Sequence, residues 1–152
     1  MQLTLYTDYS LRVLIYLAVD PERQVTINEI AASYDISRNH LVKVVHNLSS
    51  LGYIRTLRGR GGGMLLARTP EEINVGEVVQ HTEPNFDIVE CFDTTNDGCP
   101  ISAGCALIKP LKLAKQAFID VLANYTIADV VANRDELVHY LSIDAIGNRN
   151  AK

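Results

Sequence analysis

The three cysteines of the chain, Cys91, Cys99 and Cys105, lie together in the stretch CFDTTNDGCPISAGC. The Asp, Asn, Gly, Ser and Thr residues around them favour a loop over a helix or a strand. Thiolates bind zinc and iron–sulfur clusters strongly, but a closed site of either kind usually has four ligands. The spacing therefore predicts a metal or cluster site with a fourth ligand outside the loop, and zinc fits this spacing as well as a cluster does.

Two other roles compete with a metal site for the cysteines. The first is that of small buried hydrophobic side chains, but the polar, glycine-containing loop argues against burial. A disulfide is the other. The chain shows no secretory signal, and its longest early apolar run, residues 13–19, is too short to span a bilayer. We therefore expect a cytoplasmic protein with reduced thiols. His81 and His139 are further candidate ligands.

Composition and charge are those of a soluble globular protein with a mildly basic first half and an acidic second half. Of the 152 residues, 47% are hydrophobic and 21% are charged, which is typical of a globular protein. Residues 1–70 carry eight Lys/Arg against five Asp/Glu, whereas residues 71–152 carry six against thirteen. This asymmetry favours a DNA-binding module joined to an acidic part. The sequence shows no nucleophile–base pair and no paired carboxylates, so we expect no enzymatic activity.

Helix-start and helix-stop signals predict a helix-turn-helix in the first part of the chain. Thr7 is the expected N-cap of a first helix, and Thr26 with Glu29 forms a capping-box pattern for a second. A third helix is expected between Ser37 and Gly52, with its apolar residues on one face. Two short helices joined by a tight turn predict that this third helix is a recognition helix.

A basic β-hairpin is predicted directly after the recognition helix. Residues 53–58 and 64–67 can form its strands, and the glycine-rich sequence GRGGG forms its tip. Such a hairpin is typical of the wing in winged-helix proteins, where arginines reach the duplex. The alternative is a solvated polar surface. The residues expected to contact DNA are Ser37, Arg38, Asn39, His40, Lys43, Arg58 and Arg60.

A long helix is predicted after the third cysteine. Its apolar residues recur at spacings of four and three, a pattern with which helices pair. These residues are Leu107, Leu111, Ala114, Phe118, Val121 and Tyr125. We expect a dimerisation helix, the alternative being a helix that packs on its own domain. Pro110 must lie in the first turn of this helix or kink it.

The remaining segments complete the expected domain organisation. A short helix is expected from Thr69 to Val79, and another at residues 127–131. The chain then divides into a DNA-binding domain (1–80), a cysteine loop (81–105), a dimerisation helix with a C-terminal helix (106–146) and a disordered tail (147–152).

With wing, cysteine loop and long helix in this order, residues 1–132 resemble the winged-helix iron–sulfur regulators, the family of IscR and RirA. The stretches that carry the match are MQLT-x-x-TDYSLRVLIYLA, DISRNHLVKVVHNL, RGRGGGMLLA and NYTIADVV. The resemblance implies a mainly α fold with a small β-hairpin wing, and a homodimer that binds palindromic operator DNA. It is strongest to the nitric-oxide-sensing repressors of the family, through TDY and SRNHLVKV, which implies target genes for nitric-oxide detoxification.

The resemblance also implies a fourth ligand. Some family members have a ligand histidine three residues after the third cysteine, but this position is Ile108 here. The nitric-oxide-sensing members use an aspartate from the first helix of the other subunit, and the matching residue is Asp8. The implied site is a 4Fe–4S cluster, in preference to 2Fe–2S, whose nitrosylation releases the operator. From the residues alone, Asp8 is equally an acid in a first helical turn that pairs with Arg12.

Two alternative functions remain compatible with the sequence. One is a regulator that senses iron or cluster status. The other is a DNA-binding protein whose cysteine loop holds a structural zinc ion.

Overall fold

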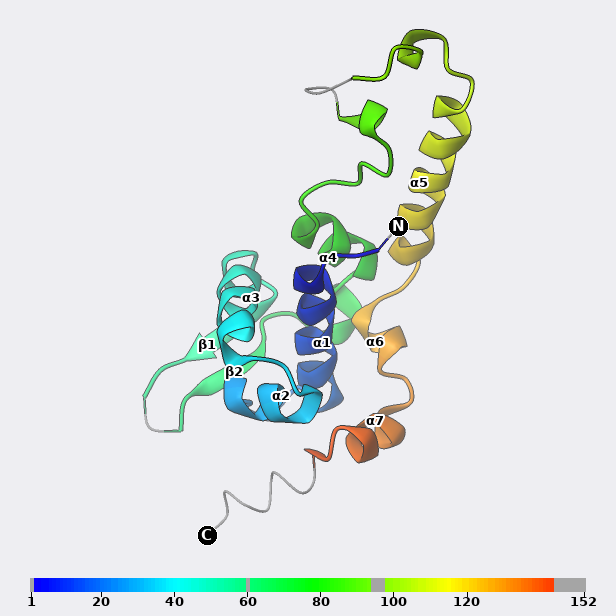
Figure 1. Ribbon diagram of the computed structural model, residues 1–152. Helices are drawn as coiled ribbons and strands as arrows, with labels where there is room; N and C mark the ends of the chain where they lie inside the picture. The colour runs from blue at the N-terminus through cyan, green and yellow to red at the C-terminus, as the bar shows by residue number, and fades with distance from the viewer. Residues whose placement is uncertain (1, 60, 94–97, 144–152) are drawn as a thin grey trace.

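Helix α1 (Leu5–Val19) is the central element of the fold. The computed structural model describes residues 2–59, 61–93 and 98–143, and within them α1 contacts α3, α4, β2, α6 and α7 (Figure 1). The second half of α1 is almost entirely buried, including Val13, Leu14, Leu17 and Val19. The other elements pack around this apolar half, whereas Asp8 and Arg12 in the first half remain partly exposed.

Helices α2 (Ile27–Tyr34) and α3 (Arg38–Ser50) form the predicted helix-turn-helix. The capping box is confirmed, because the Thr26 side chain accepts from the Glu29 N–H and the Glu29 carboxylate accepts from the Thr26 N–H. Gly52 has a φ of 74°, as expected of a residue just past a helix end. The predicted apolar face of α3 is buried: Leu41, Val44, Val45 and Leu48.

Strands β1 (Ile54–Leu57) and β2 (Gly63–Leu66) form the predicted antiparallel hairpin, in which Ile54 pairs with Leu66. A fold of helices with one small hairpin is therefore confirmed. The hairpin projects beside α3 from the N-terminal part of the chain, residues 2–82, which we call the head (Figure 1). Arg58 is exposed just past β1, whereas Arg60 lies outside the described residues.

The start of α1 differs from the prediction. Its N-cap is Thr4 rather than Thr7, and the Thr4 side chain accepts from the Thr7 N–H at 3.3 Å. Thr7 itself is fully buried. Both threonines suit an N-cap by residue type, and a contact between Thr4 and a distant glutamate, described below, favours the earlier start.

The segment after the wing also differs. In place of one helix there is a 3₁₀ turn, η1 (Pro70–Glu72), followed by α4 (Val75–Thr82) with Asn74 as its N-cap. The predicted short helix near the C-terminus is α6 (Ile127–Val130), and α7 (Arg134–Tyr140), which the sequence did not predict, follows it. The predicted disordered tail, 147–152, lies outside the described residues. No helix in the described ranges is long and apolar enough to cross a bilayer.

Helix α5 (Ile108–Ala123) extends away from the head (Figure 1). The segment that contains the three cysteines, described at residues 89–93 and 98–107 and called the cysteine segment below, lies at the far end of this helix. Pro110 lies in its first turn, where a missing N–H costs no helical hydrogen bond, so no kink is required. The base of α5 is fixed to α4. The Asn74 side-chain amide donates to the Ala123 carbonyl at 2.7 Å, and the Val75 N–H donates to the Tyr125 carbonyl at 2.9 Å.

The six apolar residues predicted to form one seam on α5 lie on two different surfaces. Leu111 and Phe118 are half-buried, and Phe118 faces the segment after α4. Leu107, Val121 and Tyr125 are instead 59%, 57% and 51% exposed, and Ala114 is also exposed. Helix α5 therefore covers its own chain with one face and leaves a second apolar face uncovered in a single subunit.

Gly76 tests the contact between α4 and α5. A Cβ at this buried glycine would lie 2.8 Å from the Ala123 nitrogen, too close for the two backbones to keep their positions. We expect Gly76→Ala to lower the free energy of unfolding by about 1–3 kcal/mol, the usual cost of overpacking, in urea denaturation. Gly104→Ala is the control, because its Cβ would meet nothing within 4 Å. Equal stability of the two variants would contradict the close contact.

Candidate cysteine site and DNA-binding surface

The three cysteines lie on one irregular segment between α4 and α5. Cys91 is in the 3₁₀ turn η2 (Glu90–Phe92), and a second turn, η3 (Ser102–Gly104), separates Cys99 from Cys105. All three residues lie in the described part of the chain, are partly exposed and form no disulfide. The predicted loop therefore presents three accessible thiols.

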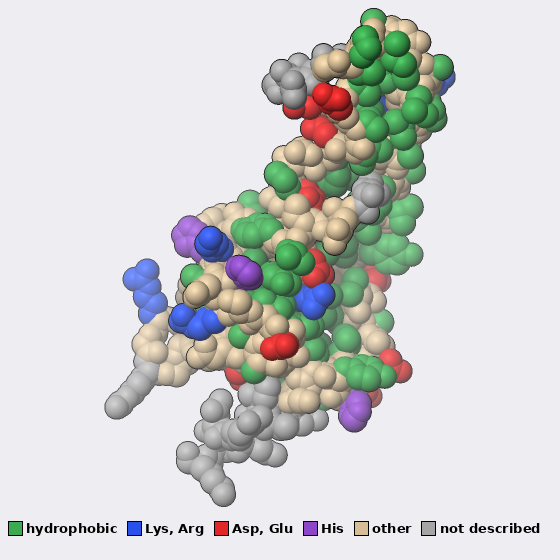
Figure 2. Space-filling view, in the orientation of Figure 1, with side chains coloured by type: hydrophobic (Ala, Val, Ile, Leu, Met, Phe, Trp, Pro, Cys, Tyr) green, Lys and Arg blue, Asp and Glu red, His purple; other side chains and the backbone are tan. Residues whose placement is uncertain are grey.

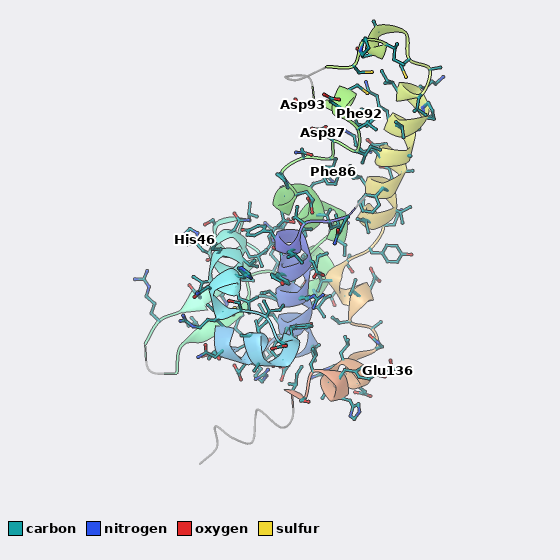
Figure 3. All side chains as sticks on the ribbon, viewed as in Figure 1. His46, Phe86, Asp87, Phe92, Asp93 and Glu136 are labelled. Atoms are coloured by element: carbon teal, nitrogen blue, oxygen red, sulfur yellow. The ribbon has the colours of Figure 1, made fainter. Side chains whose placement is uncertain are left out.

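Local contacts fold this segment back on itself. A Cβ at Gly98 would lie 2.9 Å from the Glu90 carboxylate, so the residue before Cys99 lies against the residue before Cys91. The Lys115 ammonium lies 5.0 Å from the centroid of the Phe92 ring, which attaches the segment to α5. In Figure 3, Phe86 and Asp87 lie nearer the head, and Phe92 and Asp93 lie farther along the segment.

The donor chemistry of this segment fits a metal cluster or a zinc ion, because thiolates are the preferred ligands of both. Within the described ranges, however, no three Cys, His, Asp or Glu side chains are grouped closely enough to hold a metal ion. The other candidate ligands have different contacts: His81 Nδ1 lies 2.7 Å from the Tyr53 hydroxyl, and His139 packs against Tyr140. In the described part of the chain, the three cysteines themselves are therefore not grouped as one metal site.

Asp8 lies on α1, in the head, whereas the cysteine segment lies at the far end of α5 (Figure 1). No group of three candidate metal ligands in the described ranges brings Asp8 together with the cysteines of its own chain. Its carboxylate lies 2.8 Å from Arg12, and the two side chains are 38% and 40% exposed. An ion pair this exposed contributes at most about 1 kcal/mol, so the carboxylate can exchange this partner at little cost.

Five of the predicted DNA-contacting residues share the exposed side of α3 and its N-cap. Packing of the apolar face of α3 against the core leaves its opposite face in solvent, and Ser37, Arg38, Asn39, His40 and Lys43 are all exposed. Figure 2 shows Lys, Arg and His side chains gathered over α3 and the wing, whereas hydrophobic side chains cover α5. His46, farther along α3, adds to this surface (Figure 3).

Aromatic contacts that sequence analysis missed join α1 to the recognition helix. The Tyr9 ring stacks on His40 with centroids 6.2 Å apart, and the Tyr6 hydroxyl lies 3.5 Å from the Lys43 carbonyl. Arg12 also lies over the Tyr9 ring, 6.0 Å from its centroid. The helix that carries Asp8 is therefore in direct contact with the helix expected to enter the major groove.

The family model of Rrf2, described as iron-dependent transcriptional regulators, matches residues 3–133. The chain belongs to the Rrf2 family. Its relatives include the HTH-type transcriptional regulators NsrR of Bacillus licheniformis and Bacillus subtilis, each 50% identical to it. The first matches over 143 residues, 93% of this chain and 100% of the relative. The second matches over 144 residues, 94% and 99%.

Solved structures agree with the winged-helix fold expected of an Rrf2 protein. Oxidized CymR of Staphylococcus aureus is 26% identical, with a TM-score of 0.67 over 86% of this chain and 95% of that one. IscR of T. potens has the same fold, at 23% identity and a TM-score of 0.71, covering 90% of both chains. The predicted fold class is confirmed. The curated relatives are transcriptional regulators, which supports the prediction that this Rrf2 protein is a regulator and not an enzyme.

Proposed function

We propose that the protein is a homodimeric, cytoplasmic repressor that senses nitric oxide through an iron–sulfur cluster and binds a palindromic operator while the cluster is present. One observation carries this proposal. Three partly exposed cysteines lie on the segment at the far end of α5, and no group of three ligands in the described part of their own chain can hold a metal ion. An exposed carboxylate, Asp8, lies instead on the DNA-binding head. The similarity to NsrR regulators supports the nitric-oxide signal.

The chain offers four ligands of unequal strength. Cys91, Cys99 and Cys105 provide thiolates, and Asp8 of the partner subunit provides a carboxylate. We favour a 4Fe–4S cluster over a 2Fe–2S cluster. Such a cluster supplies iron that nitric oxide attacks. A carboxylate would bind iron less strongly than thiolates do, so Asp8 would be the weakest of the four ligands, and without a cluster it pairs with Arg12 at 2.8 Å.

The position of Asp8 couples the ligand to DNA binding. Because α1 contacts α3 through Tyr9 and His40, a partner that holds Asp8 also holds the recognition helix. Two heads fixed in this way would match successive major grooves of a palindromic site. A coupling free energy of about 1–3 kcal/mol between the two sites changes operator affinity about 5- to 150-fold.

The uncovered face of α5 is the surface we propose for dimerisation. Leu113 and Val121 of α5 are more than half exposed, as are Leu107 and Tyr125 just beyond its two ends. Figure 2 shows the hydrophobic surface along this helix. A second α5 packed there would remove this surface from water. It would also bring the cysteine segment of each subunit toward the head of the other.

Metal analysis of anaerobically purified protein separates the cluster from its main alternative. We expect iron and acid-labile sulfide at a stoichiometry near one cluster per chain, with the visible absorbance of thiolate-bound iron. A colourless protein with one zinc per chain would instead support a structural zinc site and exclude the proposed sensor.

Arg58 tests the wing. We expect Arg58→Ala to weaken binding to all DNA sequences and to lower the slope of log K against log salt by about 1, because one phosphate contact is lost. Fluorescence anisotropy with operator DNA at several salt concentrations measures both quantities. Arg134→Ala is the matched control, because Arg134 is equally exposed but lies on α7. An unchanged slope for Arg58→Ala would contradict a wing contact.

A further inference from the structure

The end of α4 contacts the start of α1 through one carboxylate. Glu83, the C-cap of α4, accepts hydrogen bonds from the Thr4 N–H at 2.6 Å and from the Thr4 hydroxyl at 3.1 Å. Thr4 is the N-cap of α1, so the negative charge also lies at the favourable end of the helix dipole. The contact joins residues 79 positions apart, and it fixes the helix start one turn before Asp8.

This carboxylate bridges two segments that otherwise pack loosely. Residues 2–4 and 83–88, with Phe118 of α5, line a cleft of about 300 Å³. In the described part of the chain, the side-chain hydrogen bonds between these two segments all end on Glu83. Residues 83–88 continue directly into the cysteine segment, so Glu83 joins that segment to the start of α1.

A second contact, made by His81, joins the end of α4 to the wing. Tyr53, immediately before β1, is 1% exposed, and its hydroxyl lies 2.7 Å from His81 Nδ1. Burial is the main cause that raises the pKa of Tyr53, so the phenol keeps its proton, and the tautomer of His81 decides which of the two groups donates. Thr82, between the two contact residues, is buried, and its hydroxyl donates to the Val78 carbonyl at 2.8 Å.

We propose that Glu83 and His81 are positioning residues through which the cysteine segment sets the position of α1 and of the wing in its own subunit. This inference rests on the proposed function and adds a route within each subunit to the Asp8 contact between subunits. Loss of the metal site would move residues 83–88, and the two contacts would pass this movement to both parts of the head.

The test compares Glu83→Ala and Glu83→Gln with wild type. Operator affinity is measured for the cluster-bound and cluster-free forms, and hydrogen–deuterium exchange of residues 4–8 is measured in the cluster-free form. We expect Glu83→Ala to keep the cluster absorbance, to exchange faster at residues 4–8 and to reduce the ratio of the two affinities at least about 5-fold. Glu83→Gln keeps an oxygen that accepts from Thr4, so it should retain most of the wild-type ratio. Tyr53→Phe should reduce the ratio through the wing.

The matched control is Glu72→Ala, because the Glu72 carboxylate likewise accepts from the N–H and the hydroxyl of one threonine, Thr69, but within η1. A similar loss of the affinity ratio in this control would show that helix capping in general, and not the contact at Glu83, is responsible, and would overturn the inference. So would a wild-type ratio in Glu83→Ala. If wild-type protein itself binds operator equally with and without the cluster, the proposed function fails first.

Discussion

Replacing Cys99 with serine is expected to abolish the cluster absorbance of the protein and to leave it with the operator affinity of the cluster-free form. With one thiolate gone, only Cys91 and Cys105 remain as strong ligands in the segment. Substitution of a residue that only hydrogen-bonds to a metal ligand lowers metal affinity about 10- to 100-fold. Loss of a direct ligand should lower it further. Visible absorbance, iron content and operator binding measure the effect.

The control for this variant lies three residues away in the same turn. Ser102→Ala leaves in place the backbone hydrogen bond from the Ser102 N–H to the Cys99 carbonyl, at 3.2 Å, and removes only a hydroxyl. It should bind as much iron as wild type does. Full absorbance in Cys99→Ser, or equal loss in Ser102→Ala, would contradict the ligand assignment.

Mixed dimers should show that Asp8 acts across the subunit boundary. In a dimer of one Asp8→Ala chain and one Cys91→Ser chain, the cysteines of the first chain face the intact Asp8 of the second. We expect this dimer to hold one cluster, half of the wild-type content, because one complete ligand set remains. Dimers purified through two different affinity tags, one on each chain, allow iron and absorbance per dimer to be measured.

The reciprocal mixed dimer is the control. In this dimer one chain carries both substitutions and the other is wild type. If Asp8 completes the site of the partner chain, the dimer has no complete site. If Asp8 completes the site of its own chain, the wild-type chain keeps one. We therefore expect almost no stable cluster in this second dimer. The opposite pair of results would place Asp8 and the cysteines of one site in the same chain, against the separation of α1 from the cysteine segment in the structure.

Local signals in the sequence were sufficient for most of the head. The Thr26–Glu29 capping box, the apolar face of α3 and the positive φ of Gly52 each depend on residues within one or two helical turns, and each was confirmed. The hairpin likewise follows from alternating residues around a glycine-rich tip. Such features are predictable because the interacting residues are close together in the chain.

The errors arose where distant residues decide the structure. Thr7 and Thr4 are alike as N-caps, and the contact of Thr4 with Glu83, far away in sequence, cannot be inferred from local pattern. Periodicity predicted an apolar seam on α5 but not that Phe118 would be half-buried and Val121 exposed, because the segment that covers Phe118 is distant in sequence.

For the candidate site too, the sequence predicted some features and not others. Three clustered cysteines indicated a metal site from residue type and spacing alone, and the structure presents them as accessible thiols. No pattern in the sequence singles out Asp8, whose role came from family resemblance. The contacts Tyr53–His81 and Tyr9–His40 join separate elements and had no sequence signal. Their significance follows only from the arrangement of α1, α3 and α4.

The most direct test of the central proposal is an anaerobic titration with nitric oxide, in which cluster absorbance and operator binding are followed in the same sample. We predict that the absorbance changes and that the operator is released over the same range of nitric oxide per cluster. The loss of operator affinity should be about 5- to 150-fold. Operator binding that persists after the absorbance has fully changed would contradict the account.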